Sequence, residues 1–160
     1  MIRIIVACDQ NNLIGTDKTA NQIPWHNQED FLHFKNTTLN KTLLMGRKTF
    51  EAIGKPLPKR HTYVLTKNLH VSNFDNVTYV DDLVQVIQRC REENIDLYIC
   101  GGASVYKQAF SLCDEILLSR IPGEYVGDTW LEDFSEWYEL DHIENRETFD
   151  LEVYKRRKHD

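Results

Sequence analysis

The sequence has no long hydrophobic segment. Its apolar start, Met1 to Cys8, is interrupted by Arg3 and is far shorter than the core of a signal peptide or a membrane span. None of its cysteines forms a C-x-x-C pair or has a histidine at metal-ligand spacing. The four cysteines are Cys8, Cys90, Cys100 and Cys113. We therefore expect a cytoplasmic protein with reduced thiols, without a metal site, a disulfide framework or an export signal.

An excess of basic residues is also lacking. Lys and Arg together number 19 against 25 Asp and Glu, so the net charge is −6 and the surface as a whole repels nucleic acid and anionic membranes. Basic residues gather only locally, a pattern that suits a small anionic ligand. These local groups are Arg47-Lys48, Lys55, Lys59-Arg60 and Lys67. Repeats are absent, and we expect residues 1–160 to form one domain and to act as a monomer on a small-molecule substrate.

Strand and helix patterns alternate along most of the chain. Compact apolar runs predict buried strands at Ile2–Ala7, Thr42–Met45, His61–Thr66, Val77–Val80, Leu97–Cys100 and Glu115–Ile121. Helices are predicted after Asn27, from Arg47 to Ile53, from Leu83 to Glu93 and from Val105 to Phe110. Trp137–Ile143 and Thr148–Tyr154 read as a terminal antiparallel hairpin. The predicted fold is an α/β three-layer sandwich: a twisted, mostly parallel sheet of about eight strands with an antiparallel C-terminal strand, and about four helices on both faces.

The first candidate for function lies in a loop and short amphipathic helix from Ile23 to Lys35. Asn27 offers a side-chain oxygen to the free N–H groups at the start of that helix. Asp30 precedes Phe34 by four residues, so its carboxylate shares a helix face with aromatic rings, Phe31 included, that should turn inward. A carboxylate beside apolar surface either has a dedicated partner or faces a pocket that receives one.

A purely structural interpretation of Asp30 is equally available from this segment alone. Asn27-x-x-Asp30 has nearly the spacing of a capping box, in which Asp30 would reach back to the N–H of the cap residue. Its neighbour Glu29 points about 100° away around the helix and is expected to face solvent. The choice between the two interpretations therefore depends on the rest of the chain.

Two glycine turns follow buried strands at positions suited to an anion. Gly46 precedes the cationic helix start Arg47-Lys48-Thr49, where helix N–H groups point toward a ligand. Gly101-Gly102 ends another strand and lets backbone approach a phosphate or a ring closely. The spacing differs from G-x-G-x-x-G, so the usual dinucleotide fingerprint is absent.

The polar stretch from Asp9 to Gln22 is longer than a simple connection and is expected to act as a lid.

Taken in order, these segments resemble the dihydrofolate reductase family in its short bacterial form, across essentially the whole chain. The resemblance rests on Asn12-Leu13-Ile14-Gly15, Ile23-Pro24-Trp25, Asp30, Met45-Gly46-Arg47-Lys48-Thr49, Ile53-Gly54-Lys55-Pro56-Leu57-Pro58-Lys59-Arg60, Cys100-Gly101-Gly102-Ala103-Ser104-Val105-Tyr106 and Gly127-Asp128-Thr129. Any one of these motifs alone is weak. Their order and separations favour a functional Asp30 over a capping one.

The resemblance implies hydride transfer from NADPH to C6 of 7,8-dihydrofolate with protonation of N5, giving tetrahydrofolate for one-carbon metabolism. It places Asp30, Trp25 and Ser119 in catalysis. Asp30 would accept two N–H groups from the amidine-like edge of the pterin, and partial burial should raise its pKa. Trp25 and Ser119 would hold a water nearby. Antifolates of the diaminopyrimidine and pteridine type are expected inhibitors.

The resemblance also assigns the remaining contacts. Substrate would be bound by Ala7, Cys8, Phe31, Phe34, Ile53, Leu57, Arg60 and Cys100, with Arg60 on the α-carboxylate of the glutamate tail. NADPH would be bound by Ala7, Ile14, Gly15, Gly46, Arg47, Lys48, Thr49, Leu65, Thr66, Lys67, Gly101, Gly102, Ala103, Ser104, Val105, Tyr106 and Thr129. Among these, Arg47, Thr66 and Lys67 would surround the 2′-phosphate. The loop from Gly15 to Ile23 would close over the site.

Some positions depart from the family pattern. Ala103 and Ser104 stand where many bacterial members have glycine and arginine, which puts one phosphate contact in doubt. Cys100 replaces a larger residue, and Ser119 replaces threonine but keeps the hydroxyl. Thr19–Gln22 lengthens the lid by about three residues, so its closing kinetics do not carry over.

Two other functions fit parts of the sequence. The NADPH-dependent reductase of riboflavin biosynthesis acts on a related ring system, and it would bind a ribityl-pyrimidine better than methotrexate. A non-catalytic pterin- or nucleotide-binding protein would not consume NADPH with dihydrofolate. Asp30 beside Phe34, and Arg60 placed for a carboxylate tail, favour the folate reaction over both.

Overall fold

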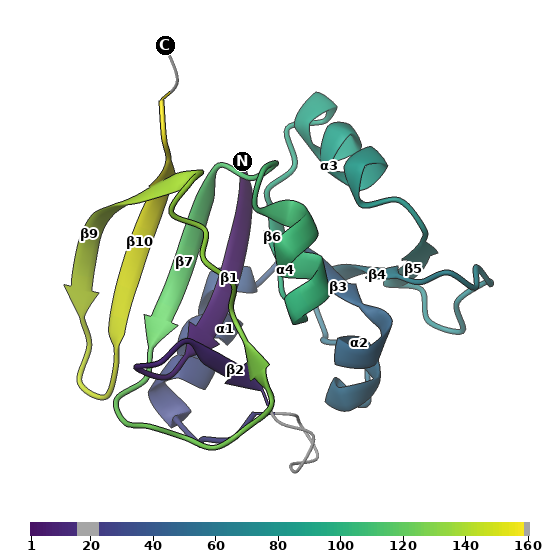
Figure 1. Cartoon of the computed structure of the whole chain (residues 1–160). Coiled ribbons are helices and arrows are strands. Elements are labelled where there is room, and N and C mark those ends of the chain that lie inside the picture. The colour runs from purple at the N-terminus through teal and green to yellow at the C-terminus, as the bar shows by residue number, and fades with distance from the viewer. Residues whose placement is uncertain (16–22, 159–160) are drawn as a thin grey trace.

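The computed structural model describes residues 1–15 and 23–158, and its centre is an eight-stranded sheet (Figure 1). The strands follow the order β5-β4-β3-β6-β1-β7-β10-β9 across the sheet. They are β1 (Ile2–Cys8), β3 (Thr42–Gly46), β4 (His61–Leu65), β5 (Val77–Val80), β6 (Leu97–Ile99), β7 (Glu115–Arg120), β9 (Tyr138–Asn145) and β10 (Asp150–Arg156). Strand β10 is antiparallel to both of its neighbours, β7 and β9, and the other pairings among these described strands are parallel. The predicted mostly parallel sheet with an antiparallel C-terminal strand is confirmed.

The central strand β1 is buried because it lies between β6 and β7. Its register places Ile4 beside Ile99 of β6 and Ile116 of β7, and all three side chains are inaccessible to solvent. A strand covered on both faces needs a continuous aliphatic run, which is what the sequence supplies. The same register places Ala7 beside Ser119 near the carboxyl end of β1, where the candidate site begins.

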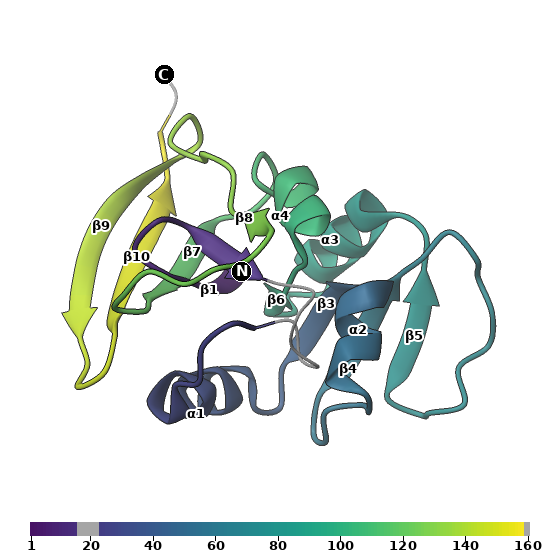
Figure 2. The same ribbon diagram turned by 60° about the horizontal axis from the view of Figure 1, so that its bottom comes forward.

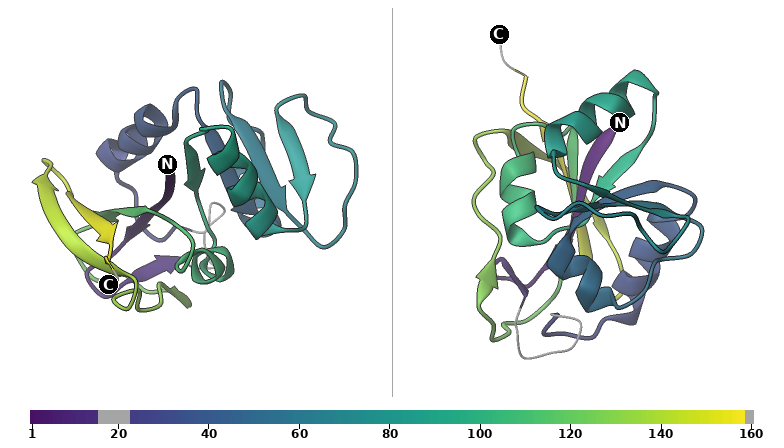
Figure 3. Two further views of the ribbon diagram at one scale, coloured as in Figure 1. Left: turned by 90° about the horizontal axis from the view of Figure 1, so that it is seen from above. Right: turned by 90° about the vertical axis from the view of Figure 1, so that its right-hand side faces the viewer.

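Helices cover both faces of the sheet in the part of the chain that the structure describes. They are α1 (Gln28–Thr38), α2 (Arg47–Ile53), α3 (Leu83–Glu92) and α4 (Ala103–Ala109). Residues of α3 and α4 pack with Ile4, whereas Phe34 of α1 and Phe50 of α2 pack with Ile5. Successive residues of a strand point to opposite faces, so α1 and α4 lie on opposite sides of the sheet (Figure 3). The three-layer prediction is confirmed, and α4 begins two residues earlier than expected.

A second, two-stranded sheet was not predicted. It pairs β2 (Leu13–Gly15) with β8 (Thr129–Trp130), which come from opposite halves of the chain (Figure 2). Gly127 permits the close approach, because a Cβ there would overlap the Gly15 carbonyl oxygen. The amide of Asp128 donates to that same oxygen at 3.2 Å. Strands this short carry no periodic pattern, so only the tertiary structure reveals the pairing.

Glu29 lies at the surface, as predicted, but its carboxylate has partners there that the sequence does not indicate. Its Oε1 accepts hydrogen bonds from the backbone N–H of Thr148 at 2.7 Å and from the Thr148 hydroxyl at 2.6 Å. Glu29 therefore fastens the start of α1 to the turn between β9 and β10. The helical wheel gave the correct direction relative to Asp30, but it could not show that this hairpin turn lies there.

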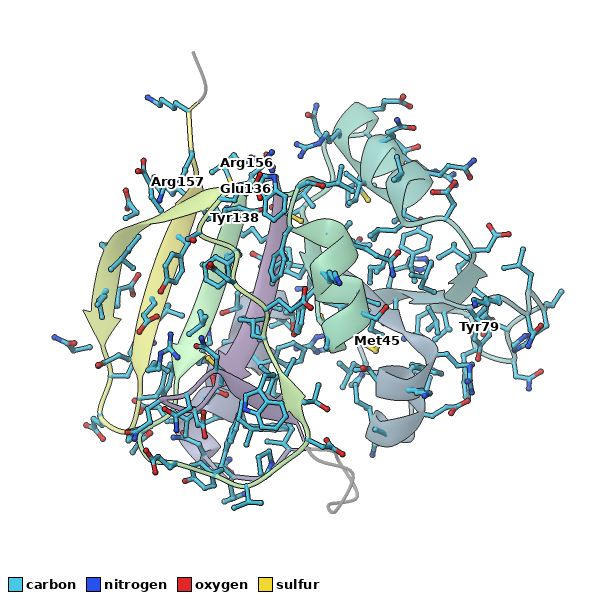
Figure 4. All side chains as sticks on the ribbon, in the orientation of Figure 1. Met45, Tyr79, Glu136, Tyr138, Arg156 and Arg157 are labelled. Carbon is cyan, nitrogen blue, oxygen red and sulfur yellow. The ribbon has the colours of Figure 1, made fainter. Side chains whose placement is uncertain are left out.

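The far end of the hairpin is fastened separately. The Arg156 guanidinium lies 5.7 Å from the centre of the Tyr138 ring, where β9 begins and β10 ends (Figure 4).

In the described residues, no helix combines the length and the apolar character needed to cross a bilayer. The four cysteines are all free thiols.

Candidate functional site

A cavity of about 1540 Å³ opens at the carboxyl ends of the parallel strands, between α1, α2, α4 and β2. Ligands of α/β sheets bind at this edge, because the helix N-termini and connecting loops meet there. Its volume exceeds the range of roughly 300–1,000 Å³ that holds one drug-sized ligand. The cavity can therefore receive two ligands side by side.

Nearly all of the predicted site residues meet in this cavity. Those that line it are Ala7, Ile14, Gly15, Trp25, Asp30, Phe31, Phe34, Gly46, Arg47, Lys48, Thr49, Ile53, Leu57, Leu65, Thr66, Lys67, Cys100, Gly101, Gly102, Ala103, Ser104, Val105, Tyr106, Ser119 and Thr129. Cys8 and Arg60 are not among the residues that line it. Cys8 is buried behind the wall, and burial raises the pKa of its thiol to about 12. The lid predicted between Gly15 and Ile23, with its insertion Thr19–Gln22, falls on residues 16–22, outside the described residues.

Asp30 is held on the cavity wall by the start of α1. The Asn27 side chain caps the helix by accepting the Asp30 N–H at 2.9 Å, as the sequence predicts. Burial raises the pKa of the Asp30 carboxyl above its ordinary value, and a hydrogen bond with the Ser119 hydroxyl opposes part of that rise. No cationic side chain contributes to this shift. The carboxyl is therefore a half-buried acid with unused acceptor capacity beside a cavity.

The side chains around Asp30 come from three elements. Ser119 is 1% exposed on β7, and the strand register sets it next to Ala7. Trp25 is buried in the loop before α1, and its ring meets the Tyr125 ring edge to face at 5.5 Å.

The expectation that Phe31 turns inward is wrong in part. Phe31 is 62% exposed and lines the cavity at its rim, because it lies about 100° around the helix from Asp30.

Arg60 is a nearly buried guanidinium, 6% exposed, at the edge of the α1 layer. Its Nε donates to the Thr38 hydroxyl at 3.1 Å and its Nη1 to the Pro58 carbonyl at 2.7 Å. Its Nη2 donates to the Lys35 carbonyl. These bonds use three of the five N–H donors and join the end of α1 to the turn before β4. The fork is fixed in orientation before any ligand arrives.

Backbone contact between two glycine turns forms the opposite wall. The Gly46 amide donates to the Gly101 carbonyl at 2.8 Å. A Cβ at Gly46 would lie 3.2 Å from Val105 Cγ2, and one at Gly102 would lie 3.4 Å from Thr49 Oγ1. Neither α2 nor α4 has a side-chain cap at its N-terminus. The first-turn N–H groups and the glycine backbone thus form a cradle that larger residues would fill.

Cations surround the mouth of this cradle. Arg47 is about half exposed and pairs with Glu51 one turn later at 2.9 Å. Lys48 and Lys67 also line the cavity. The Arg47 pair is an exposed i,i+4 ion pair, which is weak in water, so its guanidinium can exchange Glu51 for a phosphate at little cost.

Sequence reasoning missed several lining residues. They are Ile5, Val6, Ile23, His26, Asn27, His33, Ala52, Lys55, Asn68, Asp81, Asp82, Leu83, Val84, Gln108, Leu112 and Asp128. Asp81 to Val84 could have been found, since they follow β5 and the carboxyl ends of parallel strands meet at one edge. Gln108 lies one helical turn after Ser104, to which its amide donates at 3.3 Å. In the described residues, no group of three His, Cys, Asp or Glu side chains could hold a metal ion.

Comparison with known proteins assigns this arrangement to a family. The family model described as "Dihydrofolate reductase" matches residues 1–156. The dihydrofolate reductase of Bacillus subtilis (strain 168) is 38% identical over 136 residues, which is 85% of this chain and 78% of that protein. The enzyme of the same name from Mycoplasma genitalium is 34% identical over 164 residues, covering 99% of each chain.

A solved structure gives the same result in three dimensions. It is a dihydrofolate reductase from Enterococcus faecalis complexed with NADP(H) and RAB-propyl. Its TM-score to this chain is 0.86 at 29% sequence identity, and the match covers 99% of this chain and 97% of the other. The likeness therefore extends over the whole sheet and all of the helices described above.

Proposed function

Since the chain belongs to the dihydrofolate reductase family, we propose that its cavity binds NADPH and 7,8-dihydrofolate side by side and carries out the family's reaction. The chain is an NADPH-dependent oxidoreductase: a hydride passes to C6 of dihydrofolate, N5 gains a proton, and tetrahydrofolate leaves. The riboflavin-pathway reductase and a non-catalytic binding protein are not favoured by the comparisons.

The single observation that carries the site assignment is Asp30. It is a partly buried carboxyl with a raised pKa, set in the wall of a cavity large enough for two ligands. The pterin edge presents an amino group beside a ring N–H, and one carboxylate can accept both in a bidentate pair. This pairing fixes the ring's orientation, and the negative charge increases the basicity of the bound ring.

Trp25 and Ser119 support the proton transfer. The Ser119 hydroxyl is hydrogen-bonded with Asp30, and Trp25 lines the same cavity as both of them. We assign these two groups to hold a water near Asp30, so that the proton reaches N5 from solvent along a short path. The apolar wall of Phe34, Leu57 and Ile53 excludes other water from the channel of the aminobenzoyl group.

Arg60 is assigned to the α-carboxylate of the substrate's tail. The guanidinium does not line the cavity, but its three backbone and hydroxyl acceptors hold the fork rigid beside the Leu57 wall. A planar fork with two remaining donors matches a carboxylate better than a lysine would. Cys8 is assigned a supporting place behind Ala7 instead of a direct contact.

The cofactor half of the cavity fits a dinucleotide. When bound, NADPH supplies the hydride. The cradle of Gly46, Gly101 and Gly102 leaves room that a Cβ would fill, and it suits a pyrophosphate at the uncapped helix starts. Arg47 and Lys67, with Thr66, are assigned to the 2′-phosphate. Ile14 and Gly15, which line the cavity together with Ala7, are assigned to the nicotinamide end.

The assignment is tested by the oxidation of NADPH in the presence of dihydrofolate. We expect turnover by the wild type and a loss of about 10²-fold or more in Asp30→Asn, the range for removing a general acid–base group. Glu29→Gln is the matched control, because it neutralises the adjacent carboxylate, which binds Thr148 instead of the cavity. Equal activity of wild type and Asp30→Asn would refute the role of Asp30, and absence of wild-type turnover would refute the reaction.

Three further assignments complete the proposal. We propose that residues 1–160 act as one domain and as a monomer, since a single cavity is lined by residues from Ile5 to Thr129. Antifolates of the diaminopyrimidine and pteridine type bind through Asp30, which pairs with their amidine-like edge. A cytoplasmic location is supported by the four free thiols, because reduced cysteines are the norm there.

A further inference from the structure

Asp9 is a buried carboxylate that the assignments above do not use. It follows β1, is 0% exposed and does not line the cavity. Its Oδ1 accepts the backbone N–H groups of Asn11 at 2.8 Å and Leu13 at 2.9 Å, and its Oδ2 accepts that of Tyr125 at 2.9 Å. Burial alone raises the pKa of Asp9, but these three hydrogen bonds and the Arg120 charge lower it below its ordinary value.

The carboxylate joins two segments that are distant in sequence. Through Oδ1 it holds the turn that leads into β2, whose Ile14 and Gly15 line the cavity. Through Oδ2 it holds Tyr125, whose ring packs against Trp25. The same loop continues through Asp128, whose amide donates to Gly15.

Arg120 keeps this arrangement rigid from outside. Its Nη1 donates to the Asp9 carbonyl at 2.9 Å and to the Asn12 side-chain oxygen at 2.7 Å. Its other edge pairs with Glu152 of β10 at 3.0 and 3.1 Å. The Asp9 turn is therefore anchored to the sheet, and both loops attached to it are placed relative to β1 and β7.

We infer that Asp9 is a positioning residue for hydride transfer: one oxygen holds the β2 side of the cavity, the other holds the loop that supports Trp25, and the carboxylate sets their separation. The inference rests on the proposed function. Reacting atoms in such transfers must stand at about 3–3.5 Å, and a displacement of about 1 Å can cost on the order of 10²-fold in rate. Asp9 acts at a distance from the reacting atoms, through the walls that confine them.

The test separates the two oxygens. The asparagine of Asp9→Asn has only one side-chain oxygen, which can accept either the Asn11 and Leu13 N–H groups or the Tyr125 N–H. Its amide nitrogen then places a donor against the remaining N–H donor, so either the turn into β2 or the Tyr125 loop is released. The readout is the single-turnover rate of hydride transfer at saturating NADPH and dihydrofolate, measured with NADPH and with NADPH deuterated at the transferred position. We expect the rate to fall about tenfold, with the KM for dihydrofolate within about twofold of wild type, since Asp30 and Arg60 lie elsewhere.

Three further variants make the result decisive. Asp133→Asn is the matched control, because Asp133 accepts the Ser135 amide at 2.9 Å in an exposed turn, and it should keep the wild-type rate. Tyr125→Pro deletes the same N–H donor from the other partner, but it also removes the ring that packs against Trp25. It is therefore compared with Tyr125→Leu, which removes the ring alone; a rate below that of Tyr125→Leu supports the inference if Asp9→Asn does not fold, and an equal rate overturns it. A folded Asp9→Asn or Tyr125→Pro with the wild-type rate, or an equal loss in Asp133→Asn, would overturn the inference. Failure of the wild type to oxidise NADPH would instead overturn the proposed function.

Discussion

Replacing Arg60 by lysine separates its proposed ligand contact from its part in the fold. Arg60→Lys retains the charge but loses the planar fork. The donors of a lysine all lie on one nitrogen, so they can reach only one of the three separated acceptors, Thr38, Pro58 and Lys35, at a time. Two bonds from a charged donor are then lost, each worth about 1.5–3 kcal/mol in buried settings. Partial rehydration reduces the sum, so we expect the free energy of unfolding to fall by about 2–4 kcal/mol.

The effect on binding follows from the same geometry. A bidentate guanidinium–carboxylate pair is replaced by a single contact, a loss of about 1.5–3 kcal/mol. Since about 1.4 kcal/mol corresponds to a factor of ten, KM for dihydrofolate should rise about 10- to 100-fold. The kcat and the KM for NADPH should change little, because the residues that Arg60 contacts, Lys35, Thr38 and Pro58, are not assigned to the cofactor.

The assay uses two substrates. Wild type and Arg60→Lys are compared with dihydrofolate and with a dihydropterin that has no glutamate tail. With the tailless substrate we expect wild type and Arg60→Lys to have the same kcat/KM, because that substrate has no carboxylate for Arg60 to bind. A loss of kcat/KM that is equal for both substrates would show that Arg60 serves only the fold, and the tail assignment would be wrong.

Three other substitutions give distinct outcomes. The pKa of Asp30 is raised in the folded protein, so folding is favoured when its carboxyl is protonated. This contribution to the free energy of unfolding is complete below the unfolded pKa of about 3.9, and it is lost as the pH rises through the folded pKa. Asp30→Asn should therefore unfold at a higher denaturant concentration than wild type at pH 7, with the difference shrinking below pH 4; a less stable variant at pH 7 would contradict this. Gly101→Ala places a Cβ 3.1–3.2 Å from the Tyr106 ring at a φ of +105°, so titration should show NADPH affinity reduced about tenfold or more; unchanged affinity would refute the cradle. Lys67→Gln should raise the KM for NADPH about 3- to 10-fold and leave that for NADH unchanged, because only NADPH carries the 2′-phosphate; an equal rise for both cofactors would exclude that contact.

The sequence predicts the sheet and most of the cavity wall because their signals are local. The aliphatic run of β1 and the spaced apolar face of α3 each require burial of a particular kind. The glycines that end β3 and β6 mark the edge at which helices begin. Since parallel strands bring their carboxyl ends together, the grouping of Gly46 with Gly101 follows from topology.

Other features depend on contacts that a local pattern does not carry. Glu29 has the spacing of a solvent-facing residue, and only the β9–β10 turn gives it partners. The pairing of β2 with β8 and the capture of the Tyr125 amide by Asp9 likewise join segments far apart in sequence. These contacts determine where the loops around the cavity lie, so they could be found only in the folded structure.

The pH dependence of single-turnover hydride transfer tests the central claim most directly. Wild type, Asp30→Asn and Glu29→Gln are mixed with NADPH and dihydrofolate, and the rate is followed across the pH range in which the wild type is folded. Because Asp30 promotes protonation of the ring, we predict that the wild type and Glu29→Gln share one profile, in which the rate falls as pH rises, and that Asp30→Asn is slower and loses that inflection. An Asp30→Asn profile superimposable on that of the wild type would contradict the account.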